Sequence, residues 1–294
     1  MMTQENIGKF IAEKRKENGM TQELFAEKLG VTNRSISRWE NGKTMPDYSL
    51  FPIICETLGV ECKKYLLPAD VSQEELLKVI DEVNNDDSIH GVLMFRPLPK
   101  HINQKVVENA LAAEKDVDCQ TEASLGAVFT GQKVGFPPCT PQACMEILDF
   151  YGIDCTGKKA VVIGRSLVVG KPAAMMLIQK NATVTVCHTR TVDMPSVTRE
   201  ADIVIVAAGR AGVVGAEYVS AGQTVIDVGI NMNEEGKLCG DCDYAAVEPI
   251  VDAITPVPGG VGPMTIAMLL NNVVKAAKIA SENVELTTNN SGGK

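Results

Sequence analysis

Apolar residues recur at helical spacing through the first 60 residues of the chain. Ile7, Phe10 and Ile11 share one face of a helix that Gly19 ends, and Thr21 caps a second helix. A glycine-containing turn leads into a third amphipathic segment, and a proline opens a fourth. The pattern therefore predicts four short helices, over residues 7–18, 21–29 and 34–42 and from Pro46 through Leu50, Ile53, Ile54 and Leu58.

From residue 72 onward, amphipathic segments alternate with short apolar runs that are bounded by turn residues. The longer segments predict helices and the short apolar runs predict strands. Strands separated by helices are typical of a parallel sheet that is covered on both faces. The predicted helices cover 72–83, 102–114, 140–151, 171–180 and 262–281, and the predicted strands cover 90–95, 159–163, 183–187, 203–207 and 223–228.

Length and composition narrow the class of protein. A chain of 294 residues with 45% hydrophobic content is long enough for two or more domains. It has no apolar run of roughly 20 residues and no basic and apolar leader at its N-terminus, so we expect a cytoplasmic protein without membrane partners. Nine scattered cysteines indicate reduced thiols rather than a disulfide framework.

Charge is distributed unevenly along the chain, whose formal net charge is -9. Residues 1–67 carry ten Lys and Arg against nine Asp and Glu, whereas the remainder carries 18 against 28. Residues 1–67 are thus nearly neutral, whereas the rest of the chain is strongly acidic. This difference in net charge favours a nucleic-acid-binding module at the N-terminus.

The run from Val161 to Gly170 is a candidate phosphate-binding loop. A buried strand, a glycine-containing loop and a helix that opens at Lys171-Pro172 direct backbone N–H groups and the positive end of a helix dipole toward a phosphate. Arg165 and Ser166 in this loop suit a ribose 2′-phosphate, which favours NADP over NAD. The alternative is a pair of buried strands with incidental polar ends.

Five motifs occur together in one order: Lys115-Asp-Val-Asp118, Pro138-Cys-Thr-Pro141, Gly164-Arg-Ser166, Val169-Gly-Lys-Pro172 and Thr255-Pro-Val-Pro-Gly-Gly-Val-Gly-Pro-Met-Thr265. On these motifs, residues of about 66–282 resemble the methylenetetrahydrofolate dehydrogenase/cyclohydrolase family of the FolD type. The resemblance implies an α/β fold with a Rossmann-like parallel-sheet domain and a truncated α/β folate domain. It also implies NADP-dependent oxidation of 5,10-methylenetetrahydrofolate to the methenyl form.

The resemblance assigns roles to particular residues. The cofactor-binding set is Gly164, Arg165, Ser166, Thr189 and Ile230. Asp118 is implied as the catalytic-site carboxylate that accepts N–H donors from the pterin ring. Pro258, Gly259 and Gly260 are implied at the substrate, with residues 255–265 facing the cofactor across an interdomain cleft.

Other positions depart from the family pattern. The Tyr-x-x-x-Lys signature of the first βαβ unit is absent, since neither Tyr48 nor Tyr65 has lysine four positions on. Gly91 to Pro99 resembles a strand and loop that usually read Val-Gln-Leu-Pro-Leu-Pro, but the glutamine is Phe95 here, and Cys119 and Ser124 replace the usual glycine and asparagine. General acid–base help for opening the methenyl ring is therefore hard to supply. Hydride transfer depends less on these residues, because it requires that the substrate be aligned with the nicotinamide rather than that a proton be transferred.

The segment from Met20 to Gly42 resembles the phage-repressor-like helix-turn-helix family. The resemblance implies that five residues face DNA: Gln22, Asn33, Arg34, Ser35 and Arg38. The alternative is a four-helix mini-domain with a solvated polar face. We expect Trp39 to pack in the core in either case.

These observations predict an all-α helix-turn-helix domain at 1–66, a folate domain at 67–139 and an NADP-binding Rossmann-like domain at 140–282 whose last helix packs back on the folate domain, followed by a flexible tail at 283–294. We expect no metal site, because Cys239-Gly-Asp-Cys242 is a single C-x-x-C pair without a nearby histidine.

The first hypothesis is an NADP-dependent dehydrogenase that acts on a tetrahydrofolate derivative. The second is a homodimeric transcriptional regulator whose dehydrogenase body senses NADP or folate. The third is a fusion in which the front module only replaced a lost unit.

Overall fold

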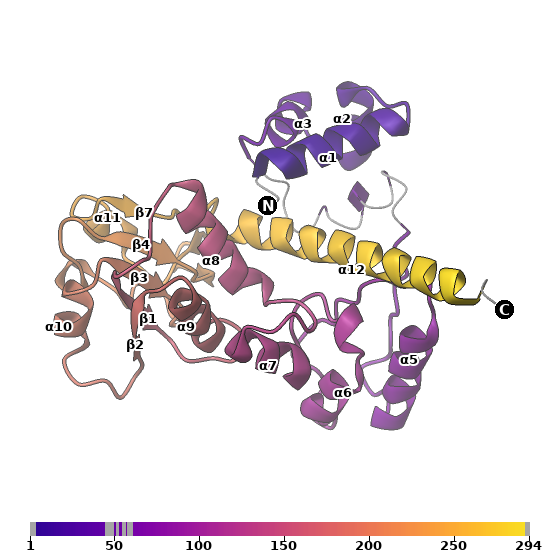
Figure 1. Cartoon of the computed structure of the whole chain (residues 1–294). Helices are drawn as coiled ribbons and strands as arrows, with labels where there is room; N and C mark the ends of the chain where they lie inside the picture. The colour runs from indigo at the N-terminus through magenta and orange to yellow at the C-terminus, as the bar shows by residue number, and fades with distance from the viewer. Residues whose placement is uncertain (1–3, 45–49, 51–52, 55–56, 58–60, 292–294) are drawn as a thin grey trace. The chain divides into compact units, whose positions relative to one another are not determined.

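The computed structural model describes residues 4–44, 50, 53–54, 57 and 61–291. The chain folds into two compact units. Unit 1 comprises Met1–Lys64 and Thr140–Met268, and unit 2 comprises Tyr65–Cys139 and Leu269–Lys294. Figure 1 follows the chain from the indigo N-terminal helices to the yellow C-terminal helix.

The N-terminal module of unit 1 contains three described helices, α1 (Gln4–Glu17), α2 (Gln22–Leu29) and α3 (Asn33–Glu40). The side chains of Thr21 and Thr32 cap α2 and α3, and Gly30 ends α2 in the left-handed conformation. Apolar positions at helical spacing meet in one core, which confirms the core role of Trp39. The buried residues include Ile11, Phe25, Leu29, Ile36 and Trp39. Of the fourth predicted helix, Leu50, Ile53 and Ile54 are described, whereas Pro46 and Leu58 lie outside the described residues.

The remainder of unit 1 is built on a five-stranded parallel sheet in the order β2-β1-β3-β4-β7. Its strands are β1 (Lys159–Ile163), β2 (Thr183–Cys187), β3 (Ile203–Val206), β4 (Thr224–Asp227) and β7 (Ala253–Ile254). Continuous apolar runs form the inner strands because a parallel sheet is buried on both faces. The four strands predicted for this region are confirmed, and β7 was missed because it has only two residues.

Shorter elements complete this region. Helix α9 (Gly170–Gln179) links β1 to β2, and α10 (Met194–Arg199) links β2 to β3. Helix α11 (Tyr244–Val247) precedes β7, and a hairpin of β5 (Asn231–Met232) and β6 (Leu238–Cys239) follows β4. A 3₁₀ turn spans Ala216–Tyr218.

Unit 2 packs α5 (Gln73–Asn85) against α6 (Gln104–Ala110) around Leu76, Ile80 and Val107. A 3₁₀ turn at Ala113–Lys115 and α7 (Glu122–Thr130) follow, and α8 (Cys139–Phe150) leads into unit 1. The helix predicted over 102–114 ends early, because the Asn84 side chain bonds both Ala110 O and Ala112 N and holds the chain extended between them.

The strand predicted at 90–95 was wrong. In the described part of this segment only Val92 pairs, through a single parallel bridge to Asp116. An apolar run becomes a strand only where neighbouring strands accept its backbone hydrogen bonds, and the pattern along the chain does not reveal whether they are present.

Helix α12 (Val261–Ser291) begins one residue before its predicted start and continues far beyond the predicted end. The expected frayed tail from 283 is helical up to Ser291, because no glycine or proline interrupts the chain between Pro263 and Gly292. Within unit 2, Asn272 of this helix donates its amide to Val117 O. None of the helices in the described part of the chain has the length and apolarity of a membrane span.

Candidate functional site

The carboxyl ends of the parallel strands bring the predicted cofactor residues to one edge of the sheet. Ile163, Cys187 and Val206 are register partners at the ends of β1, β2 and β3. The chain passes from β1 to β2 on one side and then returns to place β3 on the other side of β1. In open α/β sheets, ligands bind at the carboxyl edge at such a reversal of strand order.

The loop after β1 is shaped by two glycines and a serine. Gly164 has φ +124° and lies against Ala207 O, and a Cβ at Gly170 would collide with Gly164 O. The Ser166 hydroxyl accepts the N–H groups of Val169 at 3.1 Å and Gly170 at 3.4 Å. Ser166 thus satisfies these first N–H groups of α9 within the loop, and their role toward a phosphate stays a prediction. A hydroxyl that accepts in this way still has its own O–H available as a donor.

Exposed cations stand at the ends of β1 and β2. Arg165 and Ser166 are exposed after β1, and Thr189 and Arg190 are exposed after β2. Arg190 was not among the predicted cofactor residues, although its place three positions after a predicted strand was a usable signal. Two guanidinium groups on neighbouring loops suit a phosphate-bearing ligand.

Two buried carboxylates fix the loops after β3 and β4. Asp241 accepts the backbone N–H groups of Ala208, Gly209 and Arg210 at 2.6–2.9 Å. Asp227, at the end of β4, accepts those of Gly229, Asp241 and Cys242 at 2.9–3.0 Å. Burial raises the pKa of Asp227, and the backbone hydrogen bonds oppose that rise.

Ile230 follows this braced turn and is 69% exposed. An exposed isoleucine beside rigid backbone offers a flat apolar surface, whereas Arg165, Arg190 and the Ser166 hydroxyl offer donors to phosphate. The donor set at this edge therefore fits a phosphorylated dinucleotide.

The loop after β7 carries the predicted substrate residues Pro258, Gly259 and Gly260. Pro258 and Gly259 are exposed, and Gly259 has φ +105°. Thr255, at the start of the loop, accepts the N–H of Asp227 on its hydroxyl at 2.8 Å, which ties this loop to the end of β4. The loop after β7 is thus anchored at the same sheet edge as Gly164 and Ile230.

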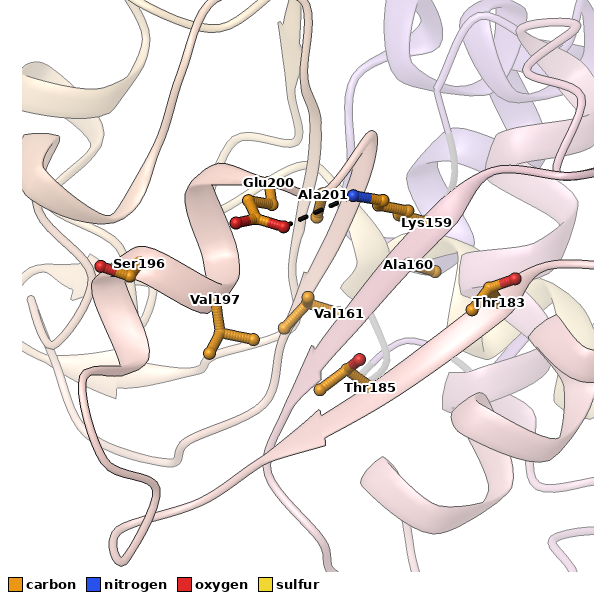
Figure 2. A pocket seen from close by; sticks show the side chains of 9 residues that line it. All are labelled: Lys159, Ala160, Val161, Thr183, Thr185, Ser196, Val197, Glu200 and Ala201. Atoms are coloured by element: carbon orange, nitrogen blue, oxygen red, sulfur yellow. Dashed lines mark hydrogen bonds and ion pairs between the residues drawn. The ribbon is translucent and has the colours of Figure 1, made fainter.

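A cavity of 320 Å³ lies elsewhere, toward the amino ends of β1 and β2 (Figure 2). It is lined by Lys159, Val161, Thr183, Thr185, Ser196, Val197 and Glu200, among others. It lies at the opposite end of these strands from the predicted cofactor loops and includes none of the predicted residues.

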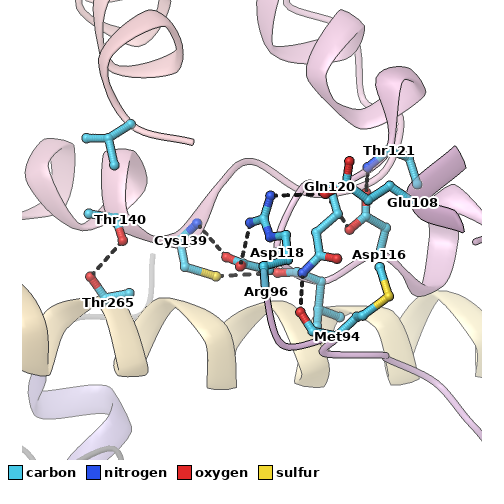
Figure 3. A network of polar contacts seen from close by, with 12 residues as sticks. Met94, Arg96, Glu108, Asp116, Asp118, Gln120, Thr121, Cys139, Thr140 and Thr265 are labelled. Carbon is cyan, nitrogen blue, oxygen red and sulfur yellow. Dashed lines mark hydrogen bonds and ion pairs between the residues drawn. The ribbon is translucent and has the colours of Figure 1, made fainter. Parts of the chain in front are cut away.

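Asp118 belongs to unit 2, where it lies in a polar network (Figure 3). Its Oδ1 accepts the Cys139 N–H at 3.4 Å, and its Oδ2 lies 3.7 Å from Nη2 of Arg96. Burial raises the pKa of Asp118, while Cys139 and Arg96 act to lower it. The side chain is 26% exposed, so it remains accessible to a ligand.

The other two polar residues of the Lys115–Asp118 motif hold the backbone. Lys115 donates to the carbonyl oxygens of Val83, Asn84 and Asp86 at 2.8–2.9 Å, which satisfies the end of α5. Asp116 is fully buried and accepts the N–H groups of Gln120 and Thr121, each at 2.8 Å. Both side chains position the loop that carries Asp118.

Three of the five predicted DNA-contact residues have partners inside the N-terminal module. The Gln22 amide donates to Glu40 at 2.7 Å, the Asn33 amide donates to Glu23 at 2.6 Å, and the Ser35 hydroxyl lies 2.9 Å from that of Thr32. Arg34 and Arg38, four residues apart on α3, are exposed.

The cysteines of the described chain form no metal cluster. No group of three or more His, Cys, Asp or Glu in the described residues is arranged to hold a metal ion. Cys242 is buried, and burial raises the pKa of its thiol. The residue with a clear structural role in this segment is Asp241, which lies between the two cysteines and accepts the N–H groups of the loop after β3.

Models of known families match most of the chain. The NAD(P)-binding domain of tetrahydrofolate dehydrogenase/cyclohydrolase matches residues 138–281, and the catalytic domain of the same family matches residues 53–118. A helix-turn-helix model matches residues 11–65, so it overlaps the start of the catalytic-domain match.

Individual relatives agree with these matches. The bifunctional protein FolD of Carboxydothermus hydrogenoformans is 54% identical over 227 residues, which cover 76% of this chain and 79% of that protein. The crystal structure of the bifunctional FolD enzyme of Campylobacter jejuni is 40% identical with a TM-score of 0.77, covering 92% of this chain and 97% of that one. The Trypanosoma brucei enzyme, solved with NADP cofactor and an inhibitor, is 30% identical with a TM-score of 0.75, covering 92% and 96%. The chain therefore belongs to the tetrahydrofolate dehydrogenase/cyclohydrolase family of the FolD type, with a helix-turn-helix module at its N-terminus.

Proposed function

We propose that the chain oxidises 5,10-methylenetetrahydrofolate to 5,10-methenyltetrahydrofolate with NADP. The observation that carries this proposal is the strand-end loop of Gly164, Arg165 and Ser166 beside the exposed Arg190 of the neighbouring loop. The Trypanosoma brucei relative with bound NADP supports the choice of cofactor.

Each proposed role follows from the position of the residue. Arg165 and Arg190 bind the phosphates, the Ser166 hydroxyl donates to them, and Ile230 supports the nicotinamide ring. Asp118 accepts N–H donors from the aminopyrimidine of the pterin and orients the methylene carbon. The bound cofactor supplies the hydride acceptor.

The proposed reaction stops at the methenyl product. Within the 294 residues, neither Tyr48 nor Tyr65 provides the Tyr-x-x-x-Lys signature. Phe95, at the place of the usual glutamine, is 70% exposed and has no proton to transfer. Lys115 donates to three carbonyl groups at the end of α5, so its ammonium is engaged structurally. General acid–base catalysis typically contributes about 10²–10⁴-fold, which ring opening then lacks.

Product analysis tests this proposal. The full chain is incubated with 5,10-methylenetetrahydrofolate and NADP, and the folates and NADPH are quantified by chromatography over time. We expect methenyltetrahydrofolate to accumulate with NADPH and to hydrolyse no faster than in buffer. Absence of NADPH above background at high enzyme concentration refutes the dehydrogenase, and enzyme-dependent formation of 10-formyltetrahydrofolate refutes the loss of cyclohydrolase.

A second candidate function is DNA binding by a homodimer whose dehydrogenase body responds to NADP. Arg34 and Arg38 on α3 favour it, with Lys43 just beyond, because all three are exposed cations near the predicted recognition helix. A gel shift of the gene's own upstream DNA with the full chain, titrated with NADP, tests it.

The replacement of Arg34 and Arg38 by alanine should abolish the shift, whereas replacement of the exposed Lys16 on α1 should not. A shift that survives the double substitution contradicts DNA binding through α3. A shift unaffected by NADP contradicts the sensor role.

A further inference from the structure

Arg96 lies between two carboxylates and makes no tight contact with either. Its Nη2 is 3.7 Å from Oδ2 of Asp118, and its Nη1 is 3.4 Å from Oε1 of Glu108 (Figure 3). The side chains of Arg96, Asp118 and Glu108 are 22%, 26% and 13% exposed. Partial burial weakens solvent screening, so these charges interact more strongly than a surface pair would.

The Asp118 carboxylate is useful to a donor-rich ligand only when it is ionised, because a protonated oxygen loses an acceptor site. Burial favours the neutral acid and raises the pKa of Asp118, and the carboxylate of Asp116 acts in the same direction. The thiols of Cys119 and Cys139 also face this group, and Cys139 donates its backbone N–H to it. Arg96 is the cation that the described structure places against this carboxylate.

Glu108 competes for the same guanidinium. Its Oε1 accepts from Arg96 and from the Gln104 amide, the latter at 2.7 Å. Glu108 lies on α6, whereas Asp118 follows the 3₁₀ turn at Ala113–Lys115, so two separate elements share one cation. The Val-Gln-Leu-Pro-Leu-Pro motif that residues 94–99 resemble has leucine where this chain has Arg96, and leucine offers neither carboxylate a counter-charge.

We propose that Arg96 is a positioning residue of the folate site that keeps Asp118 in its ionised, acceptor form, with Glu108 limiting how strongly it does so. The inference rests on the proposed function for what the carboxylate then binds, namely the N–H donors of a reduced pterin. Arg96 contacts the carboxylate rather than the reacting atoms. An opposite charge within about 4–6 Å favours the ionised form of an acid, so Arg96 extends the acceptor state of Asp118 to lower pH.

Titration of Asp118 in the free, full-length protein tests the charge coupling directly. The carboxyl carbons of aspartate are labelled with ¹³C, and the Asp118 signal is assigned by its loss in Asp118→Asn. We expect Arg96→Leu to raise the titration midpoint and Arg96→Lys to bring it back toward that of the parent protein. Glu108→Gln should lower the midpoint, because the guanidinium is then free to approach Asp118.

Thermal melting of the full chain checks that each variant is folded, and NADP binding, whose predicted residues lie in unit 1, checks that the effect is confined to unit 2. An unchanged midpoint in a folded Arg96→Leu variant overturns the proposal. A midpoint that rises in both Arg96→Leu and Arg96→Lys also overturns it, because loss of packing rather than charge would then explain the change.

Anaerobic calorimetry with tetrahydrofolate between acidic and neutral pH connects the coupling to binding. We expect the affinity for tetrahydrofolate to fall as the pH is lowered. This fall should occur at higher pH in Arg96→Leu and at the same pH as in the parent protein in the exposed Asp87→Asn control. If tetrahydrofolate binds the parent protein and its pH dependence does not move, the positioning role is refuted. If tetrahydrofolate fails to bind at any pH while the Asp118 midpoint still shifts, the charge coupling is supported and the proposed folate function is refuted.

Discussion

The backbone N–H of Asp241 donates to the carboxylate of Asp227 over 3.0 Å, and both side chains are at most 2% exposed. Through this contact the turn between β6 and α11 is joined to the end of β4. Asp241 in turn gathers three N–H groups from the loop after β3. The two aspartates therefore set the backbone on which Ile230 is presented.

We predict that Asp241→Asn lowers the free energy of unfolding by about 1–3 kcal/mol. An amide in place of this carboxylate turns an N–H₂ group toward backbone N–H donors and leaves at least one of them unpaired in the interior. Urea denaturation followed by circular dichroism measures the change.

Asp243→Asn is the matched control, two residues along the same segment. Asp243 caps α11 through the N–H of Ala246, and asparagine caps helices about as well. Equal stabilities of the two variants would show that Asp241 does not brace the loops.

The sequence predicted the sheet of unit 1 better than it predicted unit 2. The runs 160–163 and 203–206 are apolar throughout, and such runs are buried in a parallel sheet whatever surrounds them. Within the predicted strand 90–95, residues 92–95 are also apolar throughout, but they have only one bridge, at Val92. Strand formation there depends on partners far along the chain, which no local pattern encodes.

The candidate site shows the same limit. Arg165 and Ser166 were predicted from a short motif after a strand, and the family resemblance added Gly164, Thr189 and Ile230. Asp241 and Lys115 were missed as structural residues. Asp241 has a partner 32 positions away at Gly209, and Lys115 has partners 32 and 31 positions away at Val83 and Asn84. Polar contacts over such separations depend on the fold rather than on spacing.

The buried ion pair of the N-terminal module gives a pH prediction. Arg15 Nε donates to Glu40 Oε1 at 2.5 Å, and their side chains are 8% and 6% exposed. Burial raises the pKa of Glu40, but the hydrogen bonds from Arg15 and Gln22 outweigh it, so the pKa lies below its ordinary value. A lowered folded pKa means that the ionised carboxylate stabilises the module above the unfolded pKa of about 4.3, and that this stability is lost as the pH falls further.

Glu40→Gln should lower the stability of this module by about 3–5 kcal/mol, because it leaves the buried Arg15 unpaired. Trp39 is the single tryptophan in the sequence and is 5% exposed, so its fluorescence in urea reports on the module selectively. Glu17→Gln removes the exposed pair with Lys14 and should change stability by no more than about 1 kcal/mol. Similar losses in the two variants would refute the role assigned to the buried pair.

Asp118→Asn should reduce kcat/KM for 5,10-methylenetetrahydrofolate roughly 10–100-fold, since a hydrogen bond to a charged group contributes about 1.5–3 kcal/mol. The affinity for NADP should stay the same, because the predicted cofactor residues lie in unit 1 and Asp118 lies in unit 2. Steady-state kinetics with each substrate varied in turn measure both effects. A loss confined to the NADP parameters would contradict the assignment of Asp118 to the pterin.

The most direct measurement of the central claim is calorimetric titration of NADP into the full-length chain and into Arg165→Leu. We predict saturable binding at one site per chain, weakened roughly 10–100-fold by the loss of Arg165, with Lys158→Leu, at the opposite end of β1, unchanged. Absence of saturable heat with the parent protein, or equal affinities for the parent and Arg165→Leu, would contradict a nucleotide site at the carboxyl edge of the sheet.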